Sequence, residues 1–350
     1  MQMYERIHNF DSLYNAHLKA RRGNSEKAAT IKFEINLLEA ILLLKQQLID
    51  KTYSLSEYKV FRVYEPKERV VMSVSYKDKV VQHSVCDNVL EPILTKTFIL
   101  DNYASQRGKG TDFGLDRLSL FMRRYYRQNG SADGWVLKCD IRKYFYNIDH
   151  AKLKNMLRKH IDCRDTLWLL DKIIDSTEGA VGIPIGNQTS QLFALLYLSG
   201  LDHFIKEKLG IAYYGRYMDD FYLIHKDKEY LKFCLNEIRK YVAALGLELN
   251  GKTNIFPLRN GIDFLGFHTY LTESGKVIRK LRRDSKANMR RRLKKYKRLH
   301  EQGKLSIKRI ECSYQSWRGH AQRGNCYHLL KKMDLLYKNL FKENNNANGV

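Results

Sequence analysis

GRYMDDFYLI, residues 215–224, places two adjacent aspartates, Asp219 and Asp220, between two apolar and aromatic runs. Such flanks are typical of β-strands, so we predict a hairpin with both aspartates at its tip. Adjacent acids often do no more than close a turn, because Asp favours turn positions. The sequence upstream decides between a plain turn and a chemical site.

A second short apolar run, WVLKCD at residues 135–140, also ends on an acid, Asp140. Three carboxylates at strand ends supply the oxygen ligands that Mg²⁺ prefers. Two Mg²⁺ ions about 3.5 to 4 Å apart can activate a 3′-hydroxyl and stabilise a leaving pyrophosphate. We therefore predict that Asp140, Asp219 and Asp220 form a two-metal site, in which Mn²⁺ can substitute for Mg²⁺.

The 350 residues carry a net charge of +24, and this charge is unevenly distributed. From Leu271 to the end there are 22 Lys and Arg against 6 Asp and Glu, a net of +16 in 80 residues. A chain this basic usually binds a polyanion, either nucleic acid or an anionic membrane. No run approaches the roughly 18 to 20 apolar residues of a membrane-spanning helix, so we predict nucleic acid and no membrane.

The N-terminus and the cysteines indicate the compartment. MQMYERIHNF is charged and contains no apolar signal core. The six cysteines are scattered without paired spacing, which favours reduced thiols. We therefore expect a cytoplasmic protein.

Periodicity divides the chain into regions of different secondary structure. The first 50 residues have helical spacing, residues 53–85 alternate like strands, and residues 85–130 are mainly helical. NQTSQLFALLYL, residues 187–198, predicts an apolar helix that begins with capping side chains. After residue 271, three apolar stripes predict three basic helices. The stripes are Met289, Leu293, Tyr296 and Leu299; Ile307, Ile310, Tyr314 and Trp317; and Tyr327, Leu330, Met333, Tyr337 and Leu340.

Residues 246–253, GLELNGKT, fit the phosphate-loop pattern G-x-x-x-x-G-K-[ST]. That motif needs a glycine-rich loop leading into a helix, so that backbone amides surround a phosphate. Here the interior is Leu-Glu-Leu and Pro257 follows soon after. We interpret the match as chance.

Taken in order, these segments resemble the motifs of reverse transcriptases. YMDD at 217–220 resembles their YxDD box, and Asp140 in LKCDIRKYFYNIDH resembles their first catalytic aspartate. VGIPIGNQTSQLFALLYLSGLD resembles their nucleotide-and-template helix, FLGF at 264–267 their primer grip, and LGLELNGKTN the loop before it. The resemblance covers about residues 55–340. It implies an α+β right-hand polymerase with fingers and palm at 1–270, where an antiparallel sheet and helices form the palm, a basic helical thumb at 271–342 and a disordered tail at 343–350.

Within that family, the chain resembles the reverse transcriptases of diversity-generating retroelements. In IGNQTSQ, residues 185–191, Ile185 and Gln191 stand where most bacterial and retroviral relatives have Gln and Pro. EPKERVV and NYASQRGKGTDFG are similar to the same subtype. The resemblance implies a bacterial or phage enzyme that copies a template-repeat RNA into cDNA with errors opposite adenines, for target-gene diversification. It also implies a small basic accessory protein as partner.

Two alternatives stay open. A retron-like or defence-associated bacterial reverse transcriptase is the alternative within the family. A non-catalytic RNA-binding protein is the alternative from another class, although intact Asp140, Asp219 and Asp220 argue against it.

The resemblance also assigns roles to individual residues. Asp140, Asp219, Asp220 and the carbonyl of Ile141 are implied to bind metal. Lys252 is implied to donate a proton to the leaving pyrophosphate, with an ordinary turn lysine as the alternative. Residues implied to bind the incoming dNTP are Lys67, Arg69, Phe145 (a gate under the sugar 2′ position), Ile185, Gly186 and Gln191. The alternative for Lys67 and Arg69 is a solvated hairpin tip, and the alternative for Phe145 is a core aromatic residue. Residues implied to contact template RNA or the RNA/cDNA duplex are Arg107, Lys109, Ser190, Tyr217, Met218, Phe264, Leu265, Gly266, Arg290, Arg291, Lys294 and Lys295.

Overall fold

The computed structural model describes residues 2–64 and 68–341 and shows an α+β fold. Lys67, for which we predicted a dNTP contact, and the predicted disordered tail at 343–350 lie outside the described residues. No helix in the described part of the chain is long and apolar enough to cross a membrane.

Helices make up most of the first 130 residues, as predicted. They are α1 Glu5–His8, α2 Phe10–Ala20, α3 Ala28–Ile35, α4 Leu37–Ile49, α5 Tyr76–Val85, α6 Glu91–Leu94 and α7 Thr111–Asn129. Two strands, β1 Lys59–Val63 and β2 Arg69–Ser73, form an antiparallel hairpin between α4 and α5. The strand prediction for residues 53–85 is therefore wrong from residue 76 onward. A helix begins there because the Ser75 side chain accepts a hydrogen bond from the Asp78 N–H and caps the first turn.

The predicted hairpin is confirmed, but only Asp219 lies at its tip, because Asp220 already begins the second strand. β4 Tyr213–Tyr217 and β5 Asp220–His225 are joined by a turn of two residues, Met218 and Asp219. The strand order of this sheet is β4-β5-β3-β6, with β3 Trp135–Asp140 beside β5 and β6 Asn254–Pro257 at one end. Asp140 therefore ends the strand that neighbours the one Asp220 begins.

Four α-helices lie between β3 and β4 in the sequence, and a fifth lies between β5 and β6. They are α8 His150–Arg158, α9 Arg164–Ile174, α10 Gln188–Tyr197, α11 Ser199–His203 and α12 Lys228–Ala244. α10 confirms the helix predicted from NQTSQLFALLYL. The expected cap is wrong in one detail, because the Asn187 side chain does not bond the helix backbone. Its Nδ2 donates instead to the Tyr58 hydroxyl at 3.0 Å.

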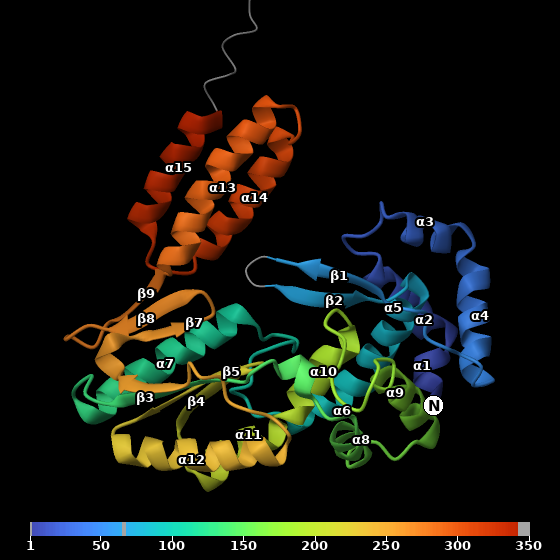
Figure 1. Ribbon diagram of the computed structural model, residues 1–350, viewed down its shortest axis with the longest axis horizontal. Helices are drawn as coiled ribbons and strands as arrows, with labels where there is room; N and C mark the ends of the chain where they lie inside the picture. The colour runs from blue at the N-terminus through green and yellow to red at the C-terminus, as the bar shows by residue number, and fades with distance from the viewer. Residues whose placement is uncertain (1, 65–67, 342–350) are drawn as a thin grey trace, which may run out of the picture. The chain divides into compact units, whose positions relative to one another are not determined.

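Three strands and three helices form the C-terminal part. β7 Ile262–Phe264, β8 Phe267–Leu271 and β9 Val277–Leu281 build an antiparallel sheet. The three predicted helices are confirmed as α13 Arg283–Glu301, α14 Ile307–Ala321 and α15 Tyr327–Phe341, which lie side by side (Figure 1). Their shared core contains Met289, Leu293, Tyr314 and Met333 from the predicted stripes.

The chain packs as two compact units. The first comprises Met1–Gly110, Leu137–Leu223 and Glu229–Asn254; the second comprises Thr111–Val136, Ile224–Lys228 and Ile255–Val350. A cut at residue 271 falls at the end of β8, whereas the first basic helix begins at Arg283. The assignment of 1–270 to fingers and palm and of 271–342 to a thumb stays a prediction.

Gly186→Ala is expected to destabilise the first unit. Gly186 has φ +131°, and a Cβ there would lie 2.7 Å from the Met72 carbonyl oxygen. The backbone strain alone costs roughly 1–3 kcal/mol, and the contact adds to it. Urea unfolding measures the loss. Gly179→Ala is the matched control, because Gly179 also has positive φ (+86°) but no atom within 4 Å of its Cβ position. An equal loss in both variants would contradict a role for the Met72 contact.

Candidate active site

Asp140 and Asp219 lie together in the first unit, one at the end of β3 and the other in the β4–β5 turn. The N–H of Ile141 donates to the Asp219 carbonyl at 3.2 Å. Asn250 holds Asp140 twice, since its N–H donates to the Asp140 carbonyl at 2.7 Å and its Nδ2 to Asp140 Oδ2 at 2.9 Å. Asn250 lies in the quoted segment LGLELNGKTN but was missed as a site residue. Ile141 itself is buried, and its role as a metal ligand stays a prediction.

The two carboxylates repel each other. Burial and the nearby charge of Asp140 raise the pKa of Asp219. A backbone hydrogen bond and the charges of Arg69 and Lys138 oppose this rise. Burial and the charge of Asp140 therefore disfavour the charged form of Asp219 in the metal-free site. A divalent cation would favour that charged form, and carboxylate oxygens are the hard ligands that suit Mg²⁺.

Asp220 does not join this pair. Its carboxylate contacts the Lys138 ammonium from the neighbouring strand β3. Lys138 stands two residues before Asp140, so both residues belong to the same face of the strand. Within residues 2–64 and 68–341, no three His, Cys, Asp or Glu side chains are grouped as a metal site. The structure thus assembles two of the three predicted ligands, and Lys138 is a counter-ion that sequence reasoning missed.

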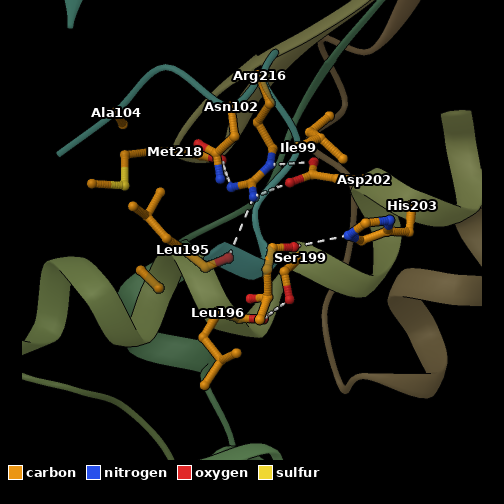
Figure 2. Close-up of polar contacts among 12 residues, drawn as sticks. Ile99, Asn102, Ala104, Leu195, Leu196, Ser199, Asp202, His203, Arg216 and Met218 are labelled. Carbon is orange, nitrogen blue, oxygen red and sulfur yellow. Dashed lines mark hydrogen bonds and ion pairs between the residues drawn. The ribbon is translucent and has the colours of Figure 1, made fainter. Parts of the chain in front are cut away.

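Arg216 of β4 forms a buried ion pair with Asp202 of α11 next to the turn (Figure 2). Its Nε donates to Asp202 Oδ1 at 2.6 Å and its Nη2 to Oδ2 at 2.5 Å. Its Nη1 donates to the Met218 carbonyl at 2.8 Å, one residue before Asp219. Burial disfavours the guanidinium charge, but Asp202 outweighs this effect and raises the pKa of Arg216. The sequence contains no signal for this pair, because its partners are 14 positions apart on different elements.

Lys252 lies on the turn that precedes β6. Its side chain is exposed, and its N–H donates to Asn250 Oδ1 at 3.1 Å. Its role as a proton donor stays a prediction. The segment 246–253 leads into a strand rather than a helix, which confirms that the phosphate-loop match is chance.

The predicted dNTP residues lie on three segments of the first unit. Arg69 begins β2, and its positive charge acts on Asp219. Ile185 accepts a hydrogen bond from the Met72 N–H of β2 at 3.0 Å, which places Ile185 and Gly186 beside the same strand. The partly buried Gln191 accepts a hydrogen bond from the Ser105 hydroxyl at 3.3 Å.

Phe145 lies in a short 3₁₀ turn, Tyr144–Asn147, and is half-buried. The two flanking tyrosines show whether Phe145 is the core aromatic residue of this turn. Tyr144 takes the core position, where it is buried and its hydroxyl donates to the Ala194 carbonyl. Tyr146 is exposed and its hydroxyl accepts from the Val70 N–H at 3.3 Å. Phe145 is therefore not the core aromatic of this segment, and its role as a sugar gate stays a prediction.

The predicted template and primer residues of the first unit differ in exposure. Ser190 is buried, Tyr217 is half-buried, and Met218 is buried in a left-handed conformation with φ 57°. Arg107 is exposed and forms an ion pair with Glu91 at 2.9 Å. The Lys109 ammonium donates to the Asn102 carbonyl at 2.9 Å, so it helps to hold its own loop. Their contacts with nucleic acid stay predictions.

The second unit carries the remaining predicted contacts. Phe264 ends β7, and Leu265 and Gly266 form the turn to β8 with φ values of 50° and 87°. The basic residues predicted to contact the duplex are all exposed on α13: Arg290, Arg291, Lys294 and Lys295. They form a solvent-facing cationic surface opposite the buried Met289 and Leu293.

Solved structures similar to this chain include a telomerase. The telomerase from Candida albicans, in complex with the TWJ fragment of telomeric RNA, is 14% identical with a TM-score of 0.53, covering 83% of this chain and 56% of that chain. Apo telomerase from Candida tropicalis is 16% identical with a TM-score of 0.50, covering 64% of this chain and 47% of its own. The same telomerase truncated from its C-terminal domain is 15% identical with a TM-score of 0.50, covering 66% and 58%. These likenesses show the polymerase fold alone, and this chain spans about half the length of the telomerases.

A search of curated proteins finds no match. The family model described as reverse transcriptase (RNA-dependent DNA polymerase) matches residues 64–269, more than half of the chain. The match includes the Asp140–Asp219 pair, strand β2 and helix α10. The chain belongs to the reverse transcriptase family of RNA-dependent DNA polymerases.

Proposed function

We propose that this chain is an RNA-directed DNA polymerase that adds deoxynucleotides to a primer 3′-hydroxyl on an RNA template. The Asp140–Asp219 pair carries this proposal. Holding two like charges together in a partly buried site costs stability, as the raised pKa of Asp219 indicates. A protein that only binds RNA has no need for such a pair, whereas a polymerase needs it to bind metal.

The chain's own residues prepare this site for metal and nucleotide. Asp140 and Asp219 would hold the ions, joined by Asp220 when it is released from Lys138, and by the Ile141 carbonyl. Bound Mg²⁺, or Mn²⁺ in its place, activates the primer hydroxyl and neutralises phosphate charge. Arg69 supplies positive charge near Asp219, where the triphosphate of a dNTP would arrive.

We infer further that the enzyme is of the diversity-generating type, making error-prone cDNA from a template-repeat RNA. The support is Ile185, whose backbone is bonded to β2 while its aliphatic side chain offers no hydrogen bond to a nascent base pair. A small basic accessory protein would be the partner. A bacterial or phage-infected cytoplasm would be the location, in keeping with six free cysteines.

Asp219→Asn is expected to abolish cDNA synthesis while RNA binding persists. The amide keeps the size of the side chain but removes the charge that a metal needs. Extension of oligo(dT) on poly(rA) measures synthesis, and filter binding measures RNA affinity. Asp162→Asn, at an exposed acid, is the matched control. Retained extension by Asp219→Asn would mean that the metal site is misplaced.

The same variant should change metal-dependent stability. The raised pKa of Asp219 means that the folded protein binds this proton more tightly than the unfolded chain does. The stability of the metal-free protein therefore falls as pH rises through the window between the ordinary and the raised pKa. Asp219→Asn should accordingly raise Tm at neutral pH without metal.

When free Mg²⁺ is at one hundred times its Kd, the free energy of unfolding of wild type should rise by about 2.7 kcal/mol. The rise for Asp219→Asn should be much smaller. Thermal melts with EDTA and with Mg²⁺ measure both effects. A variant that gains as much from Mg²⁺ as wild type would contradict metal binding by Asp219.

Ile185→Gln is expected to raise fidelity opposite template adenines. A glutamine side chain can hydrogen-bond around the nascent pair, whereas selection with isoleucine rests on shape. Sequencing cDNA made by wild type and variant from an adenine-rich RNA measures the errors. Ile185→Leu, which stays aliphatic, is the control. Unchanged adenine errors in Ile185→Gln would refute the role given to this side chain.

A further inference from the structure

The buried pair of Arg216 and Asp202 is poorly explained by stability alone. Both side chains are fully buried, and a Tyr214 hydroxyl also donates to Asp202 Oδ1 at 2.5 Å. Removing two charges from water is costly, and apolar side chains of similar volume often stabilise such sites equally well. A retained ion pair therefore points to something else that the guanidinium does.

Besides Asp202, the guanidinium bonds two carbonyls. Nη2 donates to the Leu195 carbonyl at 3.4 Å, and Nη1 makes the shorter bond, to the turn. Arg216 reaches past its neighbour Tyr217 and donates from Nη1 to the Met218 carbonyl at 2.8 Å (Figure 2). Met218 has φ 57°, a left-handed conformation that is unfavourable for a residue with a side chain. A hydrogen bond from a charged donor is stronger than one from a neutral donor, so it can hold this carbonyl in place.

The Met218 carbonyl belongs to the peptide plane that leads into Asp219. The next peptide plane is held from β3, because the Ile141 N–H donates to the Asp219 carbonyl at 3.2 Å. Both planes that flank Asp219 are thus fixed, one by a side chain anchored on α11 and the other by the strand that carries Asp140. The two bonds therefore hold the backbone on either side of Asp219, whose carboxylate is influenced by the charge of Asp140.

We propose that Arg216 is a positioning residue, whose guanidinium, anchored by Asp202, holds the Met218 carbonyl and so aims the Asp219 carboxylate at Asp140. This inference rests on the proposed polymerase function of the same site. The Arg216 side chain is fully buried. It acts through the backbone of the turn.

The test replaces the polar cluster by apolar side chains. The triple variant Arg216→Met/Asp202→Leu/Tyr214→Phe removes the charges and the hydroxyl together, so that no charge is left buried without its partner. The Met218 and Leu195 carbonyls lose their bonds to the guanidinium. Tm is expected to stay near that of wild type. For extension of oligo(dT) on poly(rA), kcat should fall about tenfold or more, because a small misplacement of a reacting group is costly, while KM for dTTP changes little. A merely structural pair would leave kcat per folded molecule unchanged, and that result would overturn the proposal.

Arg216→Lys provides a second measurement if the triple variant does not fold. Lysine keeps the charge beside Asp202, but its single ammonium lacks the planar fork that reaches Asp202 and Met218 together. A similar fall in kcat per folded molecule supports the proposal, and an unchanged kcat overturns it. Asp78→Asn is the stability control. It weakens another buried contact of the first unit, the Tyr53 hydroxyl bond at 2.7 Å, away from the turn.

Wild type and Asp219→Asn separate this inference from the proposed function. If wild type does not extend the primer, or if Asp219→Asn extends it as well, the polymerase site is wrong. If those two enzymes behave as expected but the triple variant keeps wild-type kcat, only the role of Arg216 is wrong.

Discussion

Repulsion between Asp140 and Asp219 is the constraint that the surrounding structure has to balance. The strand order brings the end of β3 next to the β4–β5 turn, and burial strengthens the repulsion by excluding water. Backbone and side-chain bonds from Ile141 and Asn250 hold the two residues in place. Proteins accept such local instability where a site must bind a charged ligand, and the rest of the fold supplies the compensating stability.

Positive charge is used in two different ways in this chain. Near the aspartates it is placed singly, with Lys138 against Asp220, Arg69 near Asp219 and Arg216 buried against Asp202. On α13 it is dense and exposed, on helical turns whose opposite face packs into a core. The buried charge of Arg216 fixes geometry, whereas an exposed basic surface attracts a polyanion over a longer distance. The net charge of +24 counts both kinds of basic residue together and does not tell one kind from the other.

The parts of the fold that follow from local sequence were predictable. The hairpin around Asp219 and the three C-terminal helices were predicted because their apolar residues repeat with the period of the element. The helix after Ser75 was missed because the strand-like pattern of residues 53–75 was extended past the Ser75 capping bond that begins it. The contacts of Lys138 and Asn250 were missed for another reason. They depend on which segments become neighbours in space, and a single sequence does not contain that information.

At Ile185 the backbone and the side chain have different roles. The backbone is bonded to β2, whereas we propose that the side chain acts in the selection of nucleotides. The Ile185 carbonyl accepts a hydrogen bond from the Met72 N–H. A Cβ on the next residue, Gly186, would lie 2.7 Å from the Met72 carbonyl oxygen. These backbone contacts fix the path of residues 185–186 whatever side chain residue 185 carries. The path of the backbone here therefore does not depend on any hydrogen bond from the Ile185 side chain. The role in base-pair selection that we propose for residue 185 can accordingly change while Asp140 and Asp219 stay held by Asn250 and Ile141.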